Sequence, residues 1–175
     1  MQIIALANKY NIPTIVDSKE DIYKYKGCTV IKPNKDEAYS LLNINTDIEL
    51  SVVHEQILHD IQSDYSIVTL ADEGISIKSQ SGVFIDKYQG TLNVIDPIGG
   101  GDIVTCIIAF FFNKLSIEDS IHIAVNMASK SVEKTGVISI SKKDIINFFF
   151  PTKIINSKYL PIFRVLPLSA YIKTP

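Results

Sequence analysis

The 175-residue sequence has few cysteines, a net charge near zero and no apolar stretch of membrane-spanning length. Its two cysteines, Cys28 and Cys106, lie far apart without the spacing of metal ligands, which argues against a disulfide framework or a zinc site. The net charge of -2 arises from scattered charges, so no basic face for a nucleic-acid backbone is expected. The most apolar stretch, Ile103 to Phe112, is shorter than the roughly 20 residues that cross a bilayer.

The first residues also lack the basic flank, long apolar run and small-residue cleavage site of a secretory signal, so we expect a cytoplasmic protein. His54 and His59 are separated by a spacing that does not place them on one helical face, which argues against a metal pair. Apolar residues make up 46% of the chain, enough to bury one sizeable core. The sequence thus predicts one domain or a large piece of one, with neither nucleic acid nor a membrane as its partner.

Short apolar strands alternate with helical patterns along most of the chain. Strands are predicted at 14–16, 28–31 and 66–70, a hairpin at 74–78 and 83–88, and helices at 1–9, 36–42, 52–61, 102–114 and 117–134. This alternation predicts an α/β layered fold with a mainly parallel sheet. From Phe148 onward, prolines punctuate short apolar pieces, so we divide the chain into a folded portion, residues 1–147, and an irregular tail, residues 148–175.

Polar or small residues follow several of the predicted strands, namely Asp17, Asn34, Ala71 and Gly99. In open α/β sheets, ligands bind outside the carboxyl ends of the strands. We therefore expect these residues to gather at one edge of the sheet, where a ligand would lie.

A glycine-rich turn, D-P-I-G-G-G-D at residues 96–102, precedes an apolar helix. Its glycines allow a tight turn with successive exposed N–H groups, and the helix adds its positive end, so the turn can hold a phosphoryl group. Asp102 would then either cap the helix or accept a proton from an attacking hydroxyl. The turn has neither the Lys-Ser/Thr ending of a Walker loop nor the G-x-G-x-x-G spacing of dinucleotide-binding folds.

Residues 96–102 resemble the D-x-x-G-x-G-D signature of the ribokinase-like (PfkB) carbohydrate kinases, with Gly100 where that family usually has alanine. The resemblance implies a three-layer α/β/α fold and ATP-dependent phosphorylation of a sugar hydroxyl. It also implies that Asp102 is the catalytic base and that Gly99, Gly100 and Gly101 form an anion hole. The resemblance covers residues 5–145 and corresponds only to the second half of such a kinase domain, without the N-terminal half and the lid.

Further motifs follow in the order that the family shows. Residues 32–37, K-P-N-K-D-E, resemble its P-N-x-x-E element, so Asn34 and Glu37 are expected either to organise Mg²⁺ through water or to cap a helix. Residues 68–74, V-T-L-A-D-E-G, resemble the strand and turn beside the nucleotide, although Ala71 replaces a glycine. The resemblance assigns nucleotide contacts to Asn34, Thr69, Ala71, Gly74, Asn126 and Gly136, and a potassium (K⁺) site to Asp96.

Within the family, residues 15–19 and 25–34 resemble the heptose 7-phosphate kinases, although Ser18 stands where those enzymes have proline. This resemblance implies ATP and a sugar phosphate as substrates, and it makes Lys19 either a phosphate contact or a solvated lysine. Two alternatives remain: a truncated, non-catalytic nucleotide-binding fragment, and a PfkB-type kinase for another sugar or nucleoside. Members of the family often dimerise through the lid, so a homodimer is an alternative to a monomer.

Overall fold

The computed structural model describes residues 2–17, 19, 21–89, 98–133 and 139–149. Within them lies a five-stranded sheet in the order β1-β2-β3-β4-β5, whose strands are Ile15–Val16, Val30–Ile31, Tyr65–Thr69, Ile75–Ser79 and Phe84–Tyr88. The α-helices are α1 (Gln2–Lys9), α2 (Lys35–Leu42), α3 (Leu50–Ile61), α4 (Gly100–Phe111), α5 (Ile117–Val132) and α6 (Lys142–Phe149). Two short 3-10 helices lie between strands: η1 (Ile22–Tyr25) between β1 and β2, and η2 (Ala71–Glu73) between β3 and β4.

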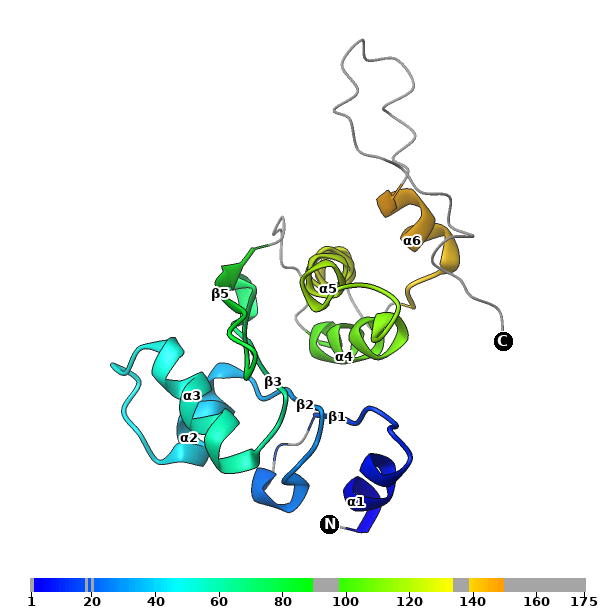
Figure 1. The fold of residues 1–175 in the computed structure, drawn as a ribbon. Coiled ribbons are helices and arrows are strands. Elements are labelled where there is room, and N and C mark those ends of the chain that lie inside the picture. Colours follow the sequence, from blue (N-terminus) through cyan, green and yellow to red (C-terminus); the bar gives the residue numbers. More distant parts are fainter. Residues whose placement is uncertain (1, 18, 20, 90–97, 134–138, 150–175) are drawn as a thin grey trace.

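Most strands of this sheet run in one direction. The pairs β1–β2 and β2–β3 are parallel, whereas β3–β4 and β4–β5 are antiparallel. Among the described strands, β4 is therefore the one that opposes the others. Figure 1 shows α1, α2 and α3 on one side of the sheet and α4 and α5 on the other, with α6 beyond α5. The predicted three-layer α/β/α fold with a mainly parallel sheet is thus confirmed.

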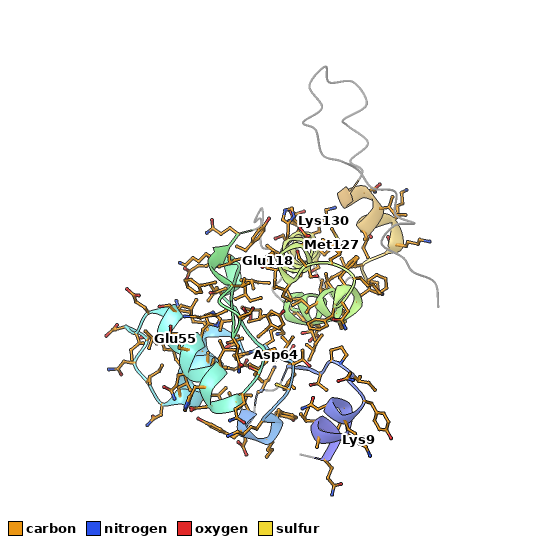
Figure 2. All side chains as sticks on the ribbon, in the orientation of Figure 1. Lys9, Glu55, Asp64, Glu118, Met127 and Lys130 are labelled. Carbon is orange, nitrogen blue, oxygen red and sulfur yellow. The ribbon has the colours of Figure 1, made fainter. Side chains whose placement is uncertain are left out.

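Successive residues of the central strands contribute to two separate cores. Val30 and Ile67 pack in the core that contains α4 and α5, whereas Ile31 and Val68 pack in the core that contains α2 and α3. Because neighbouring side chains of a strand point to opposite faces, a continuous apolar strand is buried on both sides. Figure 2 shows the side chains that fill the space between the sheet and the helices on either side. The sheet thereby holds α2 and α4 on opposite faces with their N-termini near its strand ends.

The structure adds a helix that the sequence analysis did not predict. Ser141 and Asp144 cap α6 reciprocally: the Ser141 hydroxyl accepts from the Asp144 N–H at 3.2 Å, and the Asp144 carboxylate accepts from the Ser141 N–H at 2.9 Å. This S-x-x-D pattern is the signal that would have located the helix. α6 continues to Phe149, across the boundary expected at residue 147, and the division into a folded portion and a tail stays a prediction.

The two cysteines occupy different environments. Cys28 is buried, and burial raises the pKa of its thiol to about 12, so it stays a neutral apolar group. Cys106 is exposed on α4. Across the described residues, no helix is long and apolar enough to cross a membrane.

A buried histidine ties α3 to the sheet. His54 Nε2 lies 2.9 Å from the Ser76 hydroxyl oxygen, and His54 Nδ1 lies 2.8 Å from the Ser66 hydroxyl oxygen. The single hydroxyl proton of Ser76 goes to the Ile85 carbonyl at 3.0 Å, so Ser76 accepts from Nε2–H and Nδ1 accepts from Ser66. Both ring nitrogens are thus hydrogen-bonded in the neutral tautomer that carries its proton on Nε2. Burial, with a smaller effect of the Lys78 charge, lowers the pKa of His54 to about 4.

We predict that this histidine makes the folded protein sensitive to acid. The His54 ring takes up a proton near pH 6.5 in the unfolded chain and near pH 4 in the folded chain. Between these pH values the unfolded state therefore binds more protons, so the stability of the folded protein falls as the pH falls from 6.5 to 4. The expected loss is about 3 kcal/mol of unfolding free energy between pH 7 and pH 4. Urea unfolding of the parent and of His54→Gln at several pH values measures it; equal pH dependence in both proteins would contradict the assignment.

Candidate active site

The head of α4 presents a cluster of backbone donors. Gly99 precedes the helix with a φ of +85°, in the left-handed region that favours glycine. The first intrahelical bond runs from the Ile103 N–H to the Gly99 carbonyl at 3.1 Å, so the N–H groups of Gly100, Gly101 and Asp102 have no partner within the helix. Asp102 itself is exposed in the first turn. An anion at this point would meet amide donors and the positive helix end, with a carboxylate beside it.

A buried lysine lies next to this glycine turn. Lys32 directly follows β2; its side chain is 4% exposed, and its Nζ lies 2.9 Å from Asp17 Oδ2. Asp17 directly follows β1, and the same oxygen accepts a hydrogen bond from the Thr105 hydroxyl of α4 at 2.8 Å. A Cβ added at Gly101 would stand 3.7 Å from Lys32 Nζ. The carboxyl ends of two parallel strands thus bring a buried lysine and its partly exposed carboxylate partner against the first turn of α4.

Asn34 and Glu37 meet at the N-terminus of α2. The Asn34 side chain accepts from the Glu37 N–H at 2.8 Å, and the Glu37 carboxylate accepts from the Asn34 N–H at 2.8 Å. This reciprocal capping box is the helix-cap alternative of the sequence analysis, and the assignment of both residues to magnesium stays a prediction. Asn34 also forms a parallel bridge to Thr69, so these two predicted nucleotide contacts are neighbours at the strand ends.

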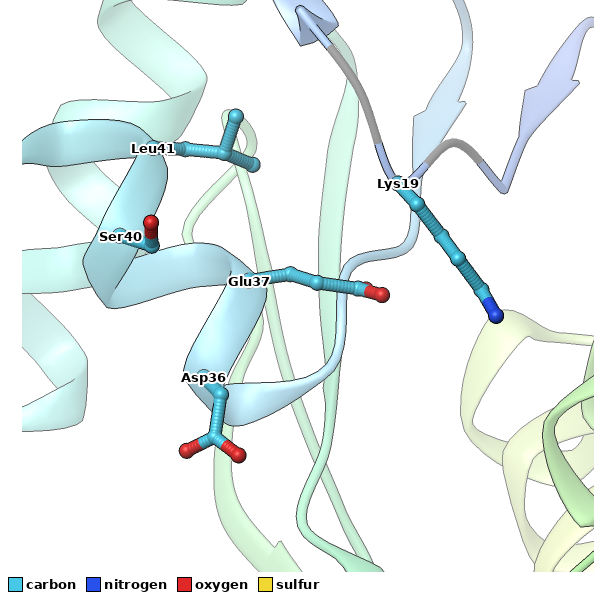
Figure 3. A pocket seen from close by; sticks show the side chains of 5 residues that line it. All are labelled: Lys19, Asp36, Glu37, Ser40 and Leu41. Atoms are coloured by element: carbon cyan, nitrogen blue, oxygen red, sulfur yellow. The ribbon is translucent and has the colours of Figure 1, made fainter.

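A small open hollow of about 270 Å³ lies between α2 and the loop that follows β1. Lys19, Asp36, Glu37, Ser40 and Leu41 line it. In Figure 3, Glu37 extends from α2 toward the side on which Lys19 lies. The hollow therefore combines one exposed ammonium group with two carboxylates, and a phosphate contact by Lys19 stays a prediction.

The turn after β3 contains two residues with positive φ, and only one of them is glycine. Gly74 has a φ of +100°, and a Cβ there would lie 2.1 Å from the Tyr88 carbonyl oxygen, so the approach of β5 requires a glycine. Ala71 has a φ of +52°, a conformation that costs an alanine roughly 1–2 kcal/mol. Both residues remain predicted nucleotide contacts, but the backbone by itself accounts for Gly74.

The remaining predicted residues are Asn126, Asp96 and Gly136. The Asn126 amide donates to the His122 carbonyl of its own helix α5 at 2.8 Å. Asp96 and Gly136 lie outside the described residues, so the K⁺ site and the second nucleotide loop stay predictions. Among the residues that the structure describes, no three His, Cys, Asp or Glu side chains converge as a metal site.

Sequence reasoning did not assign a role to Lys32 or Thr105, and it placed Asp17 at a strand end without a partner. The sequence feature that could have indicated this ion pair is a lysine directly after the β-branched run that forms β2, because a charged residue next to a buried strand needs an opposite charge nearby. Which carboxylate supplies that charge depends on strand order, which the local pattern does not contain.

Solved structures share this fold. A ribokinase from Arabidopsis thaliana, complexed with ribose and ATP, superposes with a TM-score of 0.71 over 83% of this chain and 50% of its own, at 20% sequence identity. Phosphofructokinase-2 from Escherichia coli, in complex with potassium, superposes with a TM-score of 0.68 over 83% of this chain and 49% of its own, at 19% identity. The architecture is that of the ribokinase-like α/β proteins.

Sequence comparison agrees with the fold. The family described as pfkB family carbohydrate kinase matches residues 1–144. The Bifunctional protein HldE of Campylobacter jejuni is 33% identical over 167 residues, which cover 90% of this chain and 35% of that relative. The chain belongs to the pfkB family of carbohydrate kinases. It spans about a third of the length of the curated relatives it matches.

We predict that Ala71→Gly stabilises the fold. Glycine relieves the left-handed strain but increases the entropy of the unfolded chain, so the expected net gain is about 0.5–1 kcal/mol of unfolding free energy. Ala109→Gly is the matched control, because Ala109 is exposed within α4, where the same change should cost about 1 kcal/mol. Urea unfolding measures both, and a loss of stability in Ala71→Gly would show that this backbone conformation is not the one adopted.

Proposed function

We propose that this chain carries the catalytic-base and phosphate-binding half of an ATP-dependent sugar kinase that phosphorylates heptose 7-phosphate to the 1,7-bisphosphate. The observation that carries the proposal is the head of α4, where amides without a partner in the helix adjoin an exposed Asp102. Membership in a carbohydrate kinase family supports the reaction class. The proposal concerns the whole kinase, of which the chain covers only a part.

The residues of α4 have the properties that such a transfer needs. Asp102 accepts the proton of the acceptor hydroxyl as that oxygen bonds to the γ-phosphorus and the bond to the bridging β–γ oxygen breaks, which releases ADP. The N–H groups of Gly100, Gly101 and Asp102 then stabilise the charge on the transferring phosphoryl oxygens. Positioning and electrostatics supply most of the acceleration, because the transferring group requires little covalent help.

The hollow beside α2 has donors that suit a hydrated magnesium ion. Asp36 and Glu37 line it with carboxylates, and Asn34 adds an amide at the same helix end. When bound, Mg²⁺ would neutralise charge on the β and γ oxygens, and it retains several waters, so contact through water is compatible with an intact capping box. Lys19, which also lines the hollow, would offset the charge of a phosphate group.

Heptose 7-phosphate is the favoured acceptor on two grounds. The runs at residues 15–19 and 25–34 resemble the heptose 7-phosphate kinases, and curated relatives that are 33% identical over the aligned residues are named Bifunctional protein HldE. The second candidate is a nucleotide-binding unit that transfers no phosphate. The observation behind that candidate is that the chain matches only about half of each solved kinase.

We predict that Asp102→Asn lowers sugar-dependent ADP release by about 10³-fold, because the amide keeps the shape of the carboxylate but cannot accept the proton. Nucleotide affinity should change little. A coupled ADP assay with heptose 7-phosphate, ribose and fructose 6-phosphate measures turnover, and calorimetry measures nucleotide binding.

Asp119→Asn is the matched control for that substitution, since Asp119 occupies the same third position in α5. Its turnover should equal the parent's. Full activity in Asp102→Asn would exclude Asp102 as the base. If instead the parent chain binds ADP but releases none from ATP with any of the three sugars, the non-catalytic alternative is favoured.

We also predict that Glu37→Gln raises the Mg²⁺ concentration for half-maximal rate by about tenfold, as loss of a residue that orients metal-bound water typically does. Glutamine can keep the capping box, so α2 should remain folded. Glu118→Gln, in the first turn of α5, is the control. An unshifted magnesium titration with Glu37→Gln would leave Glu37 with the capping role alone.

A further inference from the structure

One carboxylate oxygen joins the sheet to the helix that bears the candidate base. Asp17 Oδ2 lies 2.9 Å from Lys32 Nζ and accepts the Thr105 hydroxyl at 2.8 Å. Lys32 belongs to the end of β2, Asp17 to the end of β1, and Thr105 to α4. Three separate elements of the fold therefore meet at a single acceptor atom.

Burial of the lysine fixes where this acceptor must lie. The Lys32 side chain is 4% exposed, whereas that of Asp17 is 30% exposed. A buried ammonium group without a counter-charge is strongly unfavourable, so the carboxylate is drawn inward and held against it. Asp17 consequently acts as a fixed acceptor for α4, although it stands on a loop.

The fixed acceptor engages α4 one turn after its glycine-rich start. Gly99 makes no side-chain cap, and three successive glycines leave the backbone with much conformational freedom. By contrast, the polar side chains of Asn34 and Ser116 cap α2 and α5. The Thr105 hydroxyl, whose single proton goes to Asp17 at the shorter distance of 2.8 Å, also lies 3.1 Å from the Gly101 carbonyl, so the contact with Asp17 is made beside the glycine turn.

We propose that Asp17 is a positioning residue: clamped by Lys32, it holds α4 through Thr105 and so fixes the Gly100–Asp102 amides and the Asp102 carboxylate relative to the strand ends. The holding of α4 follows from these contacts alone. Its effect on turnover rests on the proposed kinase function.

Amide hydrogen exchange of the whole chain tests the holding of α4 without any need for turnover. In Thr105→Val the Ile103 amide, which donates to the Gly99 carbonyl, should exchange about fivefold faster, as expected for loss of one hydrogen bond that restrains the turn. Asp17→Asn should act in the same direction, and Thr105→Ser should restore the parent's rate. Glu55→Gln is the control, since Glu55 pairs with Lys78 between α3 and β4, away from this turn.

A double substitution separates positioning from simple stability. Asp17→Ala should lower the melting temperature because it leaves Lys32 buried without a counter-charge, and adding Lys32→Met should restore that temperature. The double variant should still show fast exchange at Ile103, since Thr105 has lost its acceptor on the sheet and keeps only the Gly101 carbonyl of its own helix. If the exchange rate recovers together with the melting temperature, the carboxylate serves stability alone and the proposal is overturned.

Kinetics test the consequence for catalysis. Thr105→Val should lower kcat about tenfold with an unchanged KM for ATP, because a displaced base affects the transition state more than binding. Thr105→Ser should recover the rate. An unchanged kcat in an active parent overturns the catalytic part of the proposal. A parent that releases no ADP with any sugar instead counts against the proposed function, and the exchange result still decides whether Asp17 holds α4.

Discussion

The ion pair between Lys32 and Asp17 is the constraint on which the arrangement of the site depends. A lysine directly after a strand buried on both faces cannot reach bulk water easily, so its charge must be met within the protein. The parallel pairing of β1 with β2 places Asp17 beside it. Because Asp17 also accepts the hydroxyl of Thr105, the requirement to satisfy one buried charge also sets the position of α4.

The helix ends around the site are fixed in two different ways. α2 begins with a self-contained capping box in which Asn34 and Glu37 satisfy each other's backbone, so that end is rigid by local chemistry. α4 begins with glycines that supply amide donors but no side-chain cap, and its first turn is held from outside. An end with uncapped amides can receive an anion, whereas an end whose first amides are already capped presents mainly side-chain oxygens. The division between phosphate binding at α4 and magnesium at α2 in the proposed function follows this contrast.

Much of the fold could be predicted from local patterns, and part of the site could not. Short apolar runs identified β2 and β3, and a helical apolar pattern identified α3, because burial imposes such patterns directly on the sequence. α6 was missed although Ser141 and Asp144 carry its cap. Gly74 was assigned to the nucleotide because of its place in a motif. The structure shows that a side chain at this position would collide with the Tyr88 carbonyl of β5, which the local pattern does not reveal. Ala71 shows the reverse, a non-glycine that keeps a left-handed backbone.

The sequence by itself determined the alternation of strands and helices, the glycine turn before an apolar helix and the family to which the chain belongs, because each depends on residues close together along the chain or on a motif. Tertiary structure alone decided that Asp17, Lys32 and Thr105 meet, since they are separated along the chain and are joined only by strand order and by the packing of α4 on the sheet. It also decided the protonation state of His54, a residue of α3 whose ring is neutral because it is buried against hydroxyls of β3 and β4. Charge and hydrogen-bond partners in a folded interior are set by neighbours in space, and a local pattern does not specify those neighbours.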